Sequence, residues 1–172
     1  MSLVSTIGYE GTTIESFVSR LRTAEITHLV DVRAVPVSRK RGFSKRQLEA
    51  RLVEEGIRYV SLKGLGDPKP GRDAARAGEY GEFRRIYRSH LQTDAAQADL
   101  RTAIDLAATT KVCILCYEKN PTECHRSIVA GEMRRLGGVE VEHLYVEGSH
   151  DGERPTYRGS AYPREGYSAT EC

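Results

Sequence analysis

The stretch from Ile26 to Val32, which reads ITHLVDV, decides the class of fold. It is apolar and β-branched with little polar alternation, which is the pattern of a strand covered on both faces. The stretch from Lys111 to Cys116, which reads KVCILC, has the same character. Strands covered on both faces belong to parallel sheets that lie between layers of helices. These two stretches therefore indicate a layered α/β domain.

Further strand patterns lie on either side of these two stretches, separated by segments with helical spacing. The expected strands cover residues 3–7, 26–32, 57–62, 111–116 and 139–146. Capping-box spacing marks helix starts at Thr12 and Ser44, and Gly137 is the expected end of a helix that begins near Glu123. Long crossovers between strands favour parallel neighbours. We expect a Rossmann-like three-layer α/β fold with a mostly parallel five-stranded sheet.

Two segments depart from the strand and helix alternation. A helical insertion covers about residues 67–110, between the third and fourth strands, and it opens on the loop-forming sequence DPKPG, after which the chain stays too polar for a core up to Gly78. Residues 148–172 are rich in Gly, Ser and charged residues, which cannot build a core element. We expect one α/β domain over residues 1–147 and a polar C-terminal tail over 148–172.

The composition excludes several classes of protein. Apolar residues make up 39% of the 172 residues and occur only in short runs, which does not fit a transmembrane helix of about 20 apolar residues. We see no signal-peptide pattern at the start. Three of the four cysteines fall within residues 113–124, whereas a disulfide framework would spread them. We therefore expect free thiols, a cytoplasmic location and no membrane partner, with a homo-oligomer left open.

The near-neutral net charge of +2 conceals a basic segment. Residues 33–46 carry six basic residues and no acidic one, which leaves 20 basic against 24 acidic residues elsewhere. Within this segment, residues 39–46 place five cations around Phe43, and cations beside an exposed aromatic ring can follow and stack on a nucleic acid. A solvated loop is the alternative interpretation.

The polar and reactive residues of the expected strands gather at one edge of the sheet. In open parallel sheets, ligands bind outside the carboxyl ends of the strands. The residues at those ends are Gly8, Tyr9, Asp31, Arg33, Pro36, Gly66, Cys116 and Glu118, followed by Cys124, His125 and Arg126 at the next helix start. A single pocket at this edge is therefore the expected site.

Cys124 is the strongest candidate for a reactive group. It lies where a helix begins, and the free N–H groups and positive dipole of a helix N-terminus stabilise a thiolate. His125 beside it supplies a proton carrier, and Arg126 supplies a fixed cation for an anionic group. The alternative is that Cys124 is only a buried first-turn residue and that Arg126 pairs with Asp31 or Glu118.

The other two cysteines of this region are expected to differ from each other. Residues three apart on a strand point to opposite faces, so Cys113 and Cys116 do not form a CxxC knuckle. Cys113 is expected in the core, and Cys116 at the site. Cys116, Cys124 and His125 are also acceptable ligands for zinc or iron, although adjacent Cys and His residues rarely reach one ion. The sequence identifies no particular cofactor.

Asp31 and Arg33 lie two residues apart and share a face if the strand continues. As functional groups, Asp31 would be a general base or hydroxyl acceptor and Arg33 would clamp a phosphate. As structural groups, they would pair with each other. The residues alone leave both interpretations open.

These motifs together resemble the family called domain of unknown function 488, over about residues 5–146. The resemblance rests on Thr6-Ile7-Gly8-Tyr9, Asp31-Val32-Arg33, Pro36-Val37-Ser38, Gly56-Ile57-Arg58-Tyr59, Leu65-Gly66, Leu115-Cys116-Tyr117-Glu118 and Cys124-His125-Arg126. It implies that Ser38 and Gly66 belong to the same site, and it supplies no reaction. Asp67 stands where the family pattern usually has a second glycine.

We interpret the chain as an enzyme that uses Cys124 or Cys116 as a nucleophile or redox thiol, in the manner of a thiol-dependent transferase or hydrolase. His125 would carry protons, and Asp31 and Glu118 would orient an anionic, phosphate-like or nucleotide-like substrate. The remaining expected contacts to that substrate come from Gly8, Tyr9, Arg33, Pro36, Ser38, Gly66 and Arg126. A transition-metal site on Cys116, Cys124 and His125, or a nucleic-acid-binding module on residues 39–46, are the alternatives.

Overall fold

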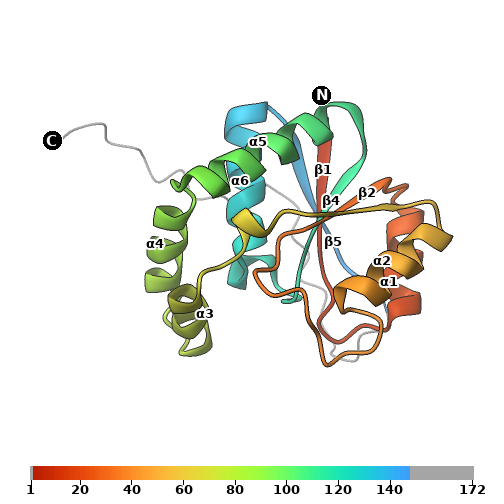
Figure 1. The fold of residues 1–172 in the computed structure, drawn as a ribbon, viewed down its shortest axis with the longest axis horizontal. Helices are drawn as coiled ribbons and strands as arrows, with labels where there is room; N and C mark the ends of the chain where they lie inside the picture. Colours follow the sequence, from red (N-terminus) through yellow and green to blue (C-terminus); the bar gives the residue numbers. More distant parts are fainter. Residues whose placement is uncertain (1, 148–172) are drawn as a thin grey trace, which may run out of the picture.

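Five parallel strands form the central sheet of the computed structural model, which describes residues 2–147 (Figure 1). The strands are β1 (Leu3–Gly8), β2 (His28–Asp31), β3 (Arg58–Ser61), β4 (Val112–Cys116) and β5 (Glu140–Leu144). Their order in the sheet is β3-β2-β4-β1-β5, and every neighbouring pair is parallel. The predicted α/β class is confirmed, and the sheet is entirely rather than mostly parallel. The predicted tail over 148–172 lies outside the described residues.

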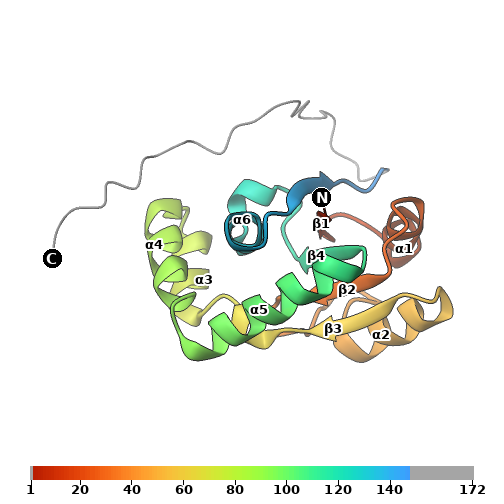
Figure 2. The same ribbon diagram turned by 90° about the horizontal axis from the view of Figure 1, so that it is seen from above.

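Six helices cover the two faces of the sheet. They are α1 (Ile14–Thr23), α2 (Lys45–Glu54), α3 (Lys69–Arg76), α4 (Tyr80–His90), α5 (Asp94–Thr109) and α6 (His125–Gly137). Helices α1 and α2 pack on one face, and α4, α5 and α6 pack on the other, which gives the three layers (Figures 1 and 2). Within residues 2–147, none of the helices has both the length and the apolar character needed to cross a membrane.

The two-residue period of the strands explains how β4 serves both cores. Val112 and Ile114 belong to the core under α4–α6, whereas Cys113 and Leu115 belong to the core under α1 and α2. All four side chains are fully buried. Cys113 and Cys116 therefore point to opposite faces, as predicted, and Cys113 is a core residue.

The insertion contains one more helix than the sequence pattern predicts. Residues 69–76 form α3, although the Pro and Gly residues around them predict a loop. Pro70 lies in the first turn of α3, where a proline has no hydrogen bond to lose and its fixed φ suits the helix. Gly71 and Ala74 are buried, so α3 also contributes a packed face against α4.

Some helix ends differ from their predicted positions. Thr13, rather than Thr12, is the N-cap of α1, where its hydroxyl accepts a hydrogen bond from Ser16 N at 3.2 Å. Gly138, rather than Gly137, ends α6, because it adopts a left-handed φ of 64°. These shifts of one residue leave the arrangement of the elements unchanged.

The carboxyl ends of the strands meet at one edge of the sheet. Gly8 at the end of β1 lies opposite Cys116 at the end of β4, and Asp31 at the end of β2 lies opposite Leu115. The register therefore brings together residues that are more than 80 positions apart in the chain. The candidate site is built on this edge.

Candidate functional site

Cys116 and Cys124 lie in contact at the carboxyl edge of β4. Cys116 ends the strand, Cys124 is the N-cap residue of α6, and their sulfurs are joined as a disulfide. The prediction of free thiols is therefore wrong for these two cysteines, while Cys113 is free and buried. The fourth cysteine, Cys172, lies outside the described residues. The two side chains are only 4% and 2% exposed.

His125 faces both sulfurs through one ring nitrogen. Its Nδ1 is 3.6 Å from Cys116 Sγ and 3.9 Å from Cys124 Sγ, and its Nε2 is 2.8 Å from the Val32 carbonyl oxygen. Because a carbonyl oxygen only accepts, Nε2 carries the hydrogen and Nδ1 presents its lone pair to the sulfurs. Burial lowers the pKa of His125 to about 4, so the ring is neutral at pH 7.

The convergence of Cys124 and His125 follows from where α6 begins. Cys124 has extended backbone angles (φ −132°, ψ 146°), and His125 is the first residue of the helix. The chain turns between the two residues, so their side chains reach the same point. Cys124 Sγ and His125 Nδ1 therefore lie 3.9 Å apart, although they belong to adjacent residues.

Glu118 completes the polar surroundings of Cys116. Its Oε2 is 3.0 Å from Cys116 Sγ, and burial raises the pKa of this carboxyl group. Because a disulfide sulfur carries no hydrogen, only the acid form of Glu118, which burial favours, can donate across this contact.

Gly8 and Glu10 hold the turn that carries Glu118. A Cβ on Gly8 would collide with the Glu118 carbonyl oxygen, so only glycine lets the turn cross the end of β1. The Glu10 carboxylate accepts a hydrogen bond from Lys119 N at 2.8 Å, and Glu10 N donates to Tyr117 O at 2.9 Å. Gly8, predicted as a substrate contact, thus serves close backbone packing.

Arg126 fastens the same turn from the side of α6. It is 1% exposed, and its guanidinium donates to the carbonyl oxygens of Glu118 and Lys119 and, at 3.3 Å, to Thr6 Oγ1. Burial lowers its pKa to about 10. The group predicted to hold a substrate anion is therefore directed at protein oxygens, and it adds a positive charge next to Glu118.

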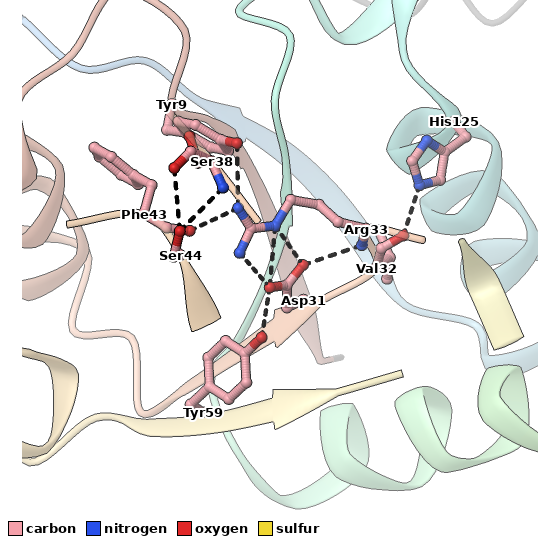
Figure 3. A network of polar contacts seen from close by, with 9 residues as sticks. All are labelled: Tyr9, Asp31, Val32, Arg33, Ser38, Phe43, Ser44, Tyr59 and His125. Atoms are coloured by element: carbon pink, nitrogen blue, oxygen red, sulfur yellow. Dashed lines mark hydrogen bonds and ion pairs between the residues drawn. The ribbon is translucent and has the colours of Figure 1, made fainter. Parts of the chain in front are cut away.

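Asp31 and Arg33 form a separate, fully buried ion pair (Figure 3). The Arg33 guanidinium donates to Asp31 at 2.6–3.1 Å, and it also donates to Tyr9 Oη at 3.1 Å and to Phe43 O at 2.8 Å. Tyr59 Oη donates to Asp31 at 2.6 Å. The structural alternative of the sequence analysis, in which these charges pair with each other, is the arrangement observed.

The ion pair is linked to the cysteines through one peptide group. Val32 lies between Asp31 and Arg33, and its carbonyl oxygen accepts the hydrogen of His125 Nε2 (Figure 3). Asp31 also accepts a hydrogen bond from Arg33 N at 3.0 Å, which fixes the backbone on the far side of Val32. The Asp31–Arg33 pair therefore positions the imidazole ring of His125.

The basic segment 39–46 packs against this edge through its aromatic ring. Phe43 is fully buried and stacks on Tyr9, with ring centroids 4.4 Å apart, so the expected exposed aromatic is wrong. Arg39 and Arg41 point outward from the segment and are exposed. The cations of the predicted nucleic-acid interface are therefore exposed, but Phe43 is not available to stack on a base.

Pro36, Ser38 and Gly66 shape the loops of this edge. The Pro36 carbonyl accepts from Lys45 N at 2.9 Å, and Ser38 N donates to Ser44 Oγ at 3.1 Å (Figure 3). A Cβ on Gly66 would approach Ala34 Cα to 2.5 Å. These residues hold the loops in place beside the site.

Sequence reasoning misses two groups near the cysteines. The Tyr87 ring of α4 lies 5.1 Å from the His125 ring, and its hydroxyl donates to Leu65 O at 2.6 Å. Asp67 is 6% exposed, and its Oδ1 has no hydrogen-bond partner among residues 2–147. Burial raises the pKa of Asp67 to about 7, with Glu118 adding to the rise. Only the departure of Asp67 from the family pattern hints at its environment.

A cavity lies elsewhere in the molecule. It has a volume of about 360 Å³ and opens at the amino edge of the sheet, where its lining includes Ser2, Ile26 and Lys111. None of the predicted site residues lines it. The candidate site at the carboxyl edge is a closely packed polar cluster.

Comparison with known proteins finds one family. The family described as "Domain of unknown function DUF488" matches residues 13–133, which is more than half of the chain. The search of curated proteins and the search of solved structures each found no match. The matched region includes Asp31, Cys116 and Cys124 but begins after β1 and ends before β5.

Proposed function

Since the chain belongs to the DUF488 family, whose description names no reaction, we propose its function from the site alone. The protein is an enzyme whose reactive group is the Cys116–Cys124 pair, which alternates between dithiol and disulfide. The observation that carries the proposal is the disulfide itself, placed against the Nδ1 lone pair of His125. This favours redox exchange over the transferase and hydrolase interpretations.

The position of the disulfide supports a chemical rather than a structural role. The two cysteines are eight residues apart, and the segments that carry them are already held by Arg126 and by the register of β4. A disulfide that closes so short a loop restricts the unfolded chain less than one that spans a long loop. In a reducing compartment, such disulfides are usually transient, catalytic or redox-sensing.

His125 orients the thiol that reacts. In the dithiol form, one thiol donates a hydrogen bond to the Nδ1 lone pair and releases its proton to solvent, and the thiolate attacks a substrate disulfide. The second thiol then attacks the resulting mixed disulfide and releases the substrate as a dithiol. In sum, two electrons and two protons pass to the substrate, and the Cys116–Cys124 bond forms.

Exposed cations close to the site support an anionic substrate. Phe43 of the basic segment stacks on Tyr9, and Tyr9 contacts Tyr117 with ring centroids 5.2 Å apart. Tyr117 is 46% exposed and directly follows Cys116. The basic segment that carries Arg39 and Arg41 is therefore connected through Tyr9 to the turn after β4, and the field of its exposed cations would draw an anion toward the cysteines.

Alkylation across a redox gradient tests the proposal. The full chain carrying Cys172→Ser is equilibrated in buffers of graded thiol-to-disulfide ratio, quenched with an alkylating agent under denaturing conditions, and analysed by mass spectrometry. We expect Cys116 and Cys124 to lose reactivity together in a single two-electron transition, while Cys113 stays reduced. His125→Gln is expected to slow the exchange at least tenfold without changing which cysteines pair.

The same experiment contains the results that contradict the proposal. Independent oxidation of Cys116 and Cys124, or a pair that stays reduced in the most oxidising buffer, would overturn it. Cys113→Ala serves as the matched control, because it removes a cysteine of the same strand on the opposite face. It should leave the transition of the pair unchanged.

A further inference from the structure

We infer that the reduced forms of Cys116 and Cys124, together with His125, bind one thiolate-preferring divalent metal ion such as Zn²⁺. Glu118 lies beside the cluster and reaches the fourth position by a movement of its side chain, because the donors of the described residues that lie within 4.8 Å of one another are these three. This inference goes beyond the proposed redox exchange, because the ion binds these atoms whether or not the pair reacts with a substrate.

The spacing of the three donors fits a tetrahedral ion. The sulfurs of both cysteines and Nδ1 of His125 all lie within 4.8 Å of one another. In a tetrahedral zinc site, with Zn–S near 2.3 Å and Zn–N near 2.0–2.1 Å, sulfur and nitrogen ligands lie about 3.6 Å apart. The distances from Nδ1 to the sulfurs are 3.6 and 3.9 Å. The distances from Nδ1 to the sulfurs therefore already match such a site, and the two sulfurs must separate to about 3.8 Å after reduction to admit the ion.

The hydrogen bond of His125 prepares its ring for metal binding. Metal-bound histidines usually donate their other N–H to a carbonyl or carboxylate, which fixes the tautomer and the orientation of the ring. His125 Nε2 donates to Val32 O at 2.8 Å, and the peptide of Val32 lies between the paired side chains of Asp31 and Arg33. The lone pair of Nδ1 is thus already directed at the sulfurs.

The charges around the cluster suit a divalent cation. Two thiolates neutralise the ion, and the remaining charge of Glu118 is balanced by the guanidinium of Arg126. Glu118 Oε2 lies 3.0 Å from Cys116 Sγ, which places a carboxyl group beside the cysteine cluster. Thiolate and imidazole donors select zinc-like ions over Mg²⁺ and Ca²⁺.

Metal binding and disulfide formation exclude each other. Binding of Zn²⁺ to the dithiol releases the two thiol protons to solvent and forms two Zn–S bonds. When a disulfide co-reactant removes two electrons from the pair, the Cys116–Cys124 bond forms, the co-reactant takes up two protons from solvent and becomes two thiols, and the ion leaves. The oxidised chain therefore has no thiolate left for the metal.

Titration with Co²⁺ and Zn²⁺ tests the inference on the full chain carrying Cys172→Ser. The protein is reduced, treated with a chelator, desalted and kept free of oxygen. We expect one Co²⁺ per chain, with thiolate-to-cobalt charge-transfer absorption and the strong visible bands of tetrahedral Co²⁺. Zn²⁺ should abolish these bands at one equivalent, and Mg²⁺ and Ca²⁺ should leave them unchanged.

Variants identify the ligands. Cys116→Ser and Cys124→Ser should each weaken Zn²⁺ binding by about 100-fold or more, and Glu118→Gln by about tenfold. Serine is a good N-cap residue, so Cys124→Ser keeps the start of α6 intact, and circular dichroism verifies that it folds. Cys113→Ala, the matched control, should bind Zn²⁺ like the parent chain.

The outcomes separate this inference from the redox proposal. A folded, reduced chain without thiolate-to-cobalt bands, equal binding by the oxidised chain, or binding unaffected by both serine variants would overturn the metal site. A normal two-electron transition of the pair in that same chain would leave the redox proposal standing. A chain that binds one Zn²⁺ through these ligands but never forms the disulfide would support the metal site and overturn the redox proposal.

Discussion

Two polar clusters share the carboxyl edge of the sheet, and they differ in how completely their atoms are paired. In the Asp31–Arg33 cluster, the carboxylate accepts from Arg33 and from Tyr59, and the guanidinium also donates to Tyr9 and to Phe43 O. In the cysteine cluster, Nδ1 of His125 faces two sulfurs, and Glu118 abuts a sulfur without a donor of its own. The comparison indicates that the cluster whose donors and acceptors are all hydrogen-bonded stabilises the fold. The cluster that keeps an acceptor without a hydrogen-bond donor, Nδ1 of His125, is the candidate functional site.

Removing Asp31 should have the largest effect on stability. Asp31→Ala leaves the buried Arg33 guanidinium without its counter-ion, and breaking such a buried pair from one side costs about 3–5 kcal/mol. Urea unfolding measures the loss. The double variant Asp31→Leu with Arg33→Met should recover much of it, because no buried charge then remains unpaired. A loss below about 1 kcal/mol for Asp31→Ala would show that this cluster is not structural.

Changing Gly8 should disturb the cysteine cluster through its backbone. A methyl group at this position collides with Glu118 O, so Gly8→Ala should destabilise the chain by about 2–4 kcal/mol or displace the turn. Thermal unfolding and the Co²⁺ spectrum report the two effects. Gly81→Ala is the control, because its Cβ would meet no neighbour within 4 Å. In helix α4 this change should raise the free energy of unfolding by about 0.5–1 kcal/mol. A Gly8→Ala chain of parental stability and spectrum would contradict the close approach.

Asp67 should make stability depend on pH. Its pKa is raised to about 7 by burial and by Glu118, against the lowering effect of Arg72, so the folded chain holds a proton that the unfolded chain releases above about pH 4. The contribution of Asp67 to stability therefore falls as pH rises from 4 to 7. The difference in free energy of unfolding between Asp67→Asn and the parent chain should shift by about 2 kcal/mol in favour of the variant between pH 4 and pH 7. The exposed control Asp105→Asn should show no such gain, and parallel stability curves for Asp67→Asn and the parent would refute the prediction.

Removing a sulfur of the proposed redox pair should have the smallest effect on the fold. Under reducing conditions, Cys124→Ser should change the free energy of unfolding by about 1 kcal/mol or less, because serine also caps a helix. Cys113→Ser places a hydroxyl among apolar core side chains and should cost about 1–3 kcal/mol. If Cys124→Ser proves the more damaging of the two, the cysteine cluster is part of what holds the fold.

The framework of the site follows from sequence patterns, because parallel strands with covered faces carry their carboxyl ends to one edge. The side-chain period of two also places Cys113 and Cys116 on opposite faces. These inferences depend on the apolar runs of β2 and β4 and on the fixed alternation of side chains along any strand. The positions of Cys116, Cys124 and His125 at one edge follow in the same way.

The pairing of side chains does not follow from such patterns. Whether the Arg33 and Arg126 guanidinium groups face solvent or protein oxygens depends on loops folded above them, and each is directed inward by partners far along the chain. Phe43 is buried for the same reason, because Tyr9 from another segment offers it a stacking surface. The contact between Cys116 and Cys124 depends on the path of residues 117–123, which no periodicity describes.

The strand order has a consequence for how the chain reaches this state. β1 leaves the ribosome before its partners β4 and β5, which begin more than 100 residues later, at Val112 and Glu140. β1 must therefore wait unpaired until these strands are made, and the Gly8 turn that supports Glu118 cannot form before β4 arrives. A segment restricted to residues 13–133 lacks both β1 and β5. Because β1 is the neighbour of β4 in the sheet, the edge of β4 that ends at Cys116 would then be unpaired. The candidate site is thus completed only after strands from both ends of the described residues have paired.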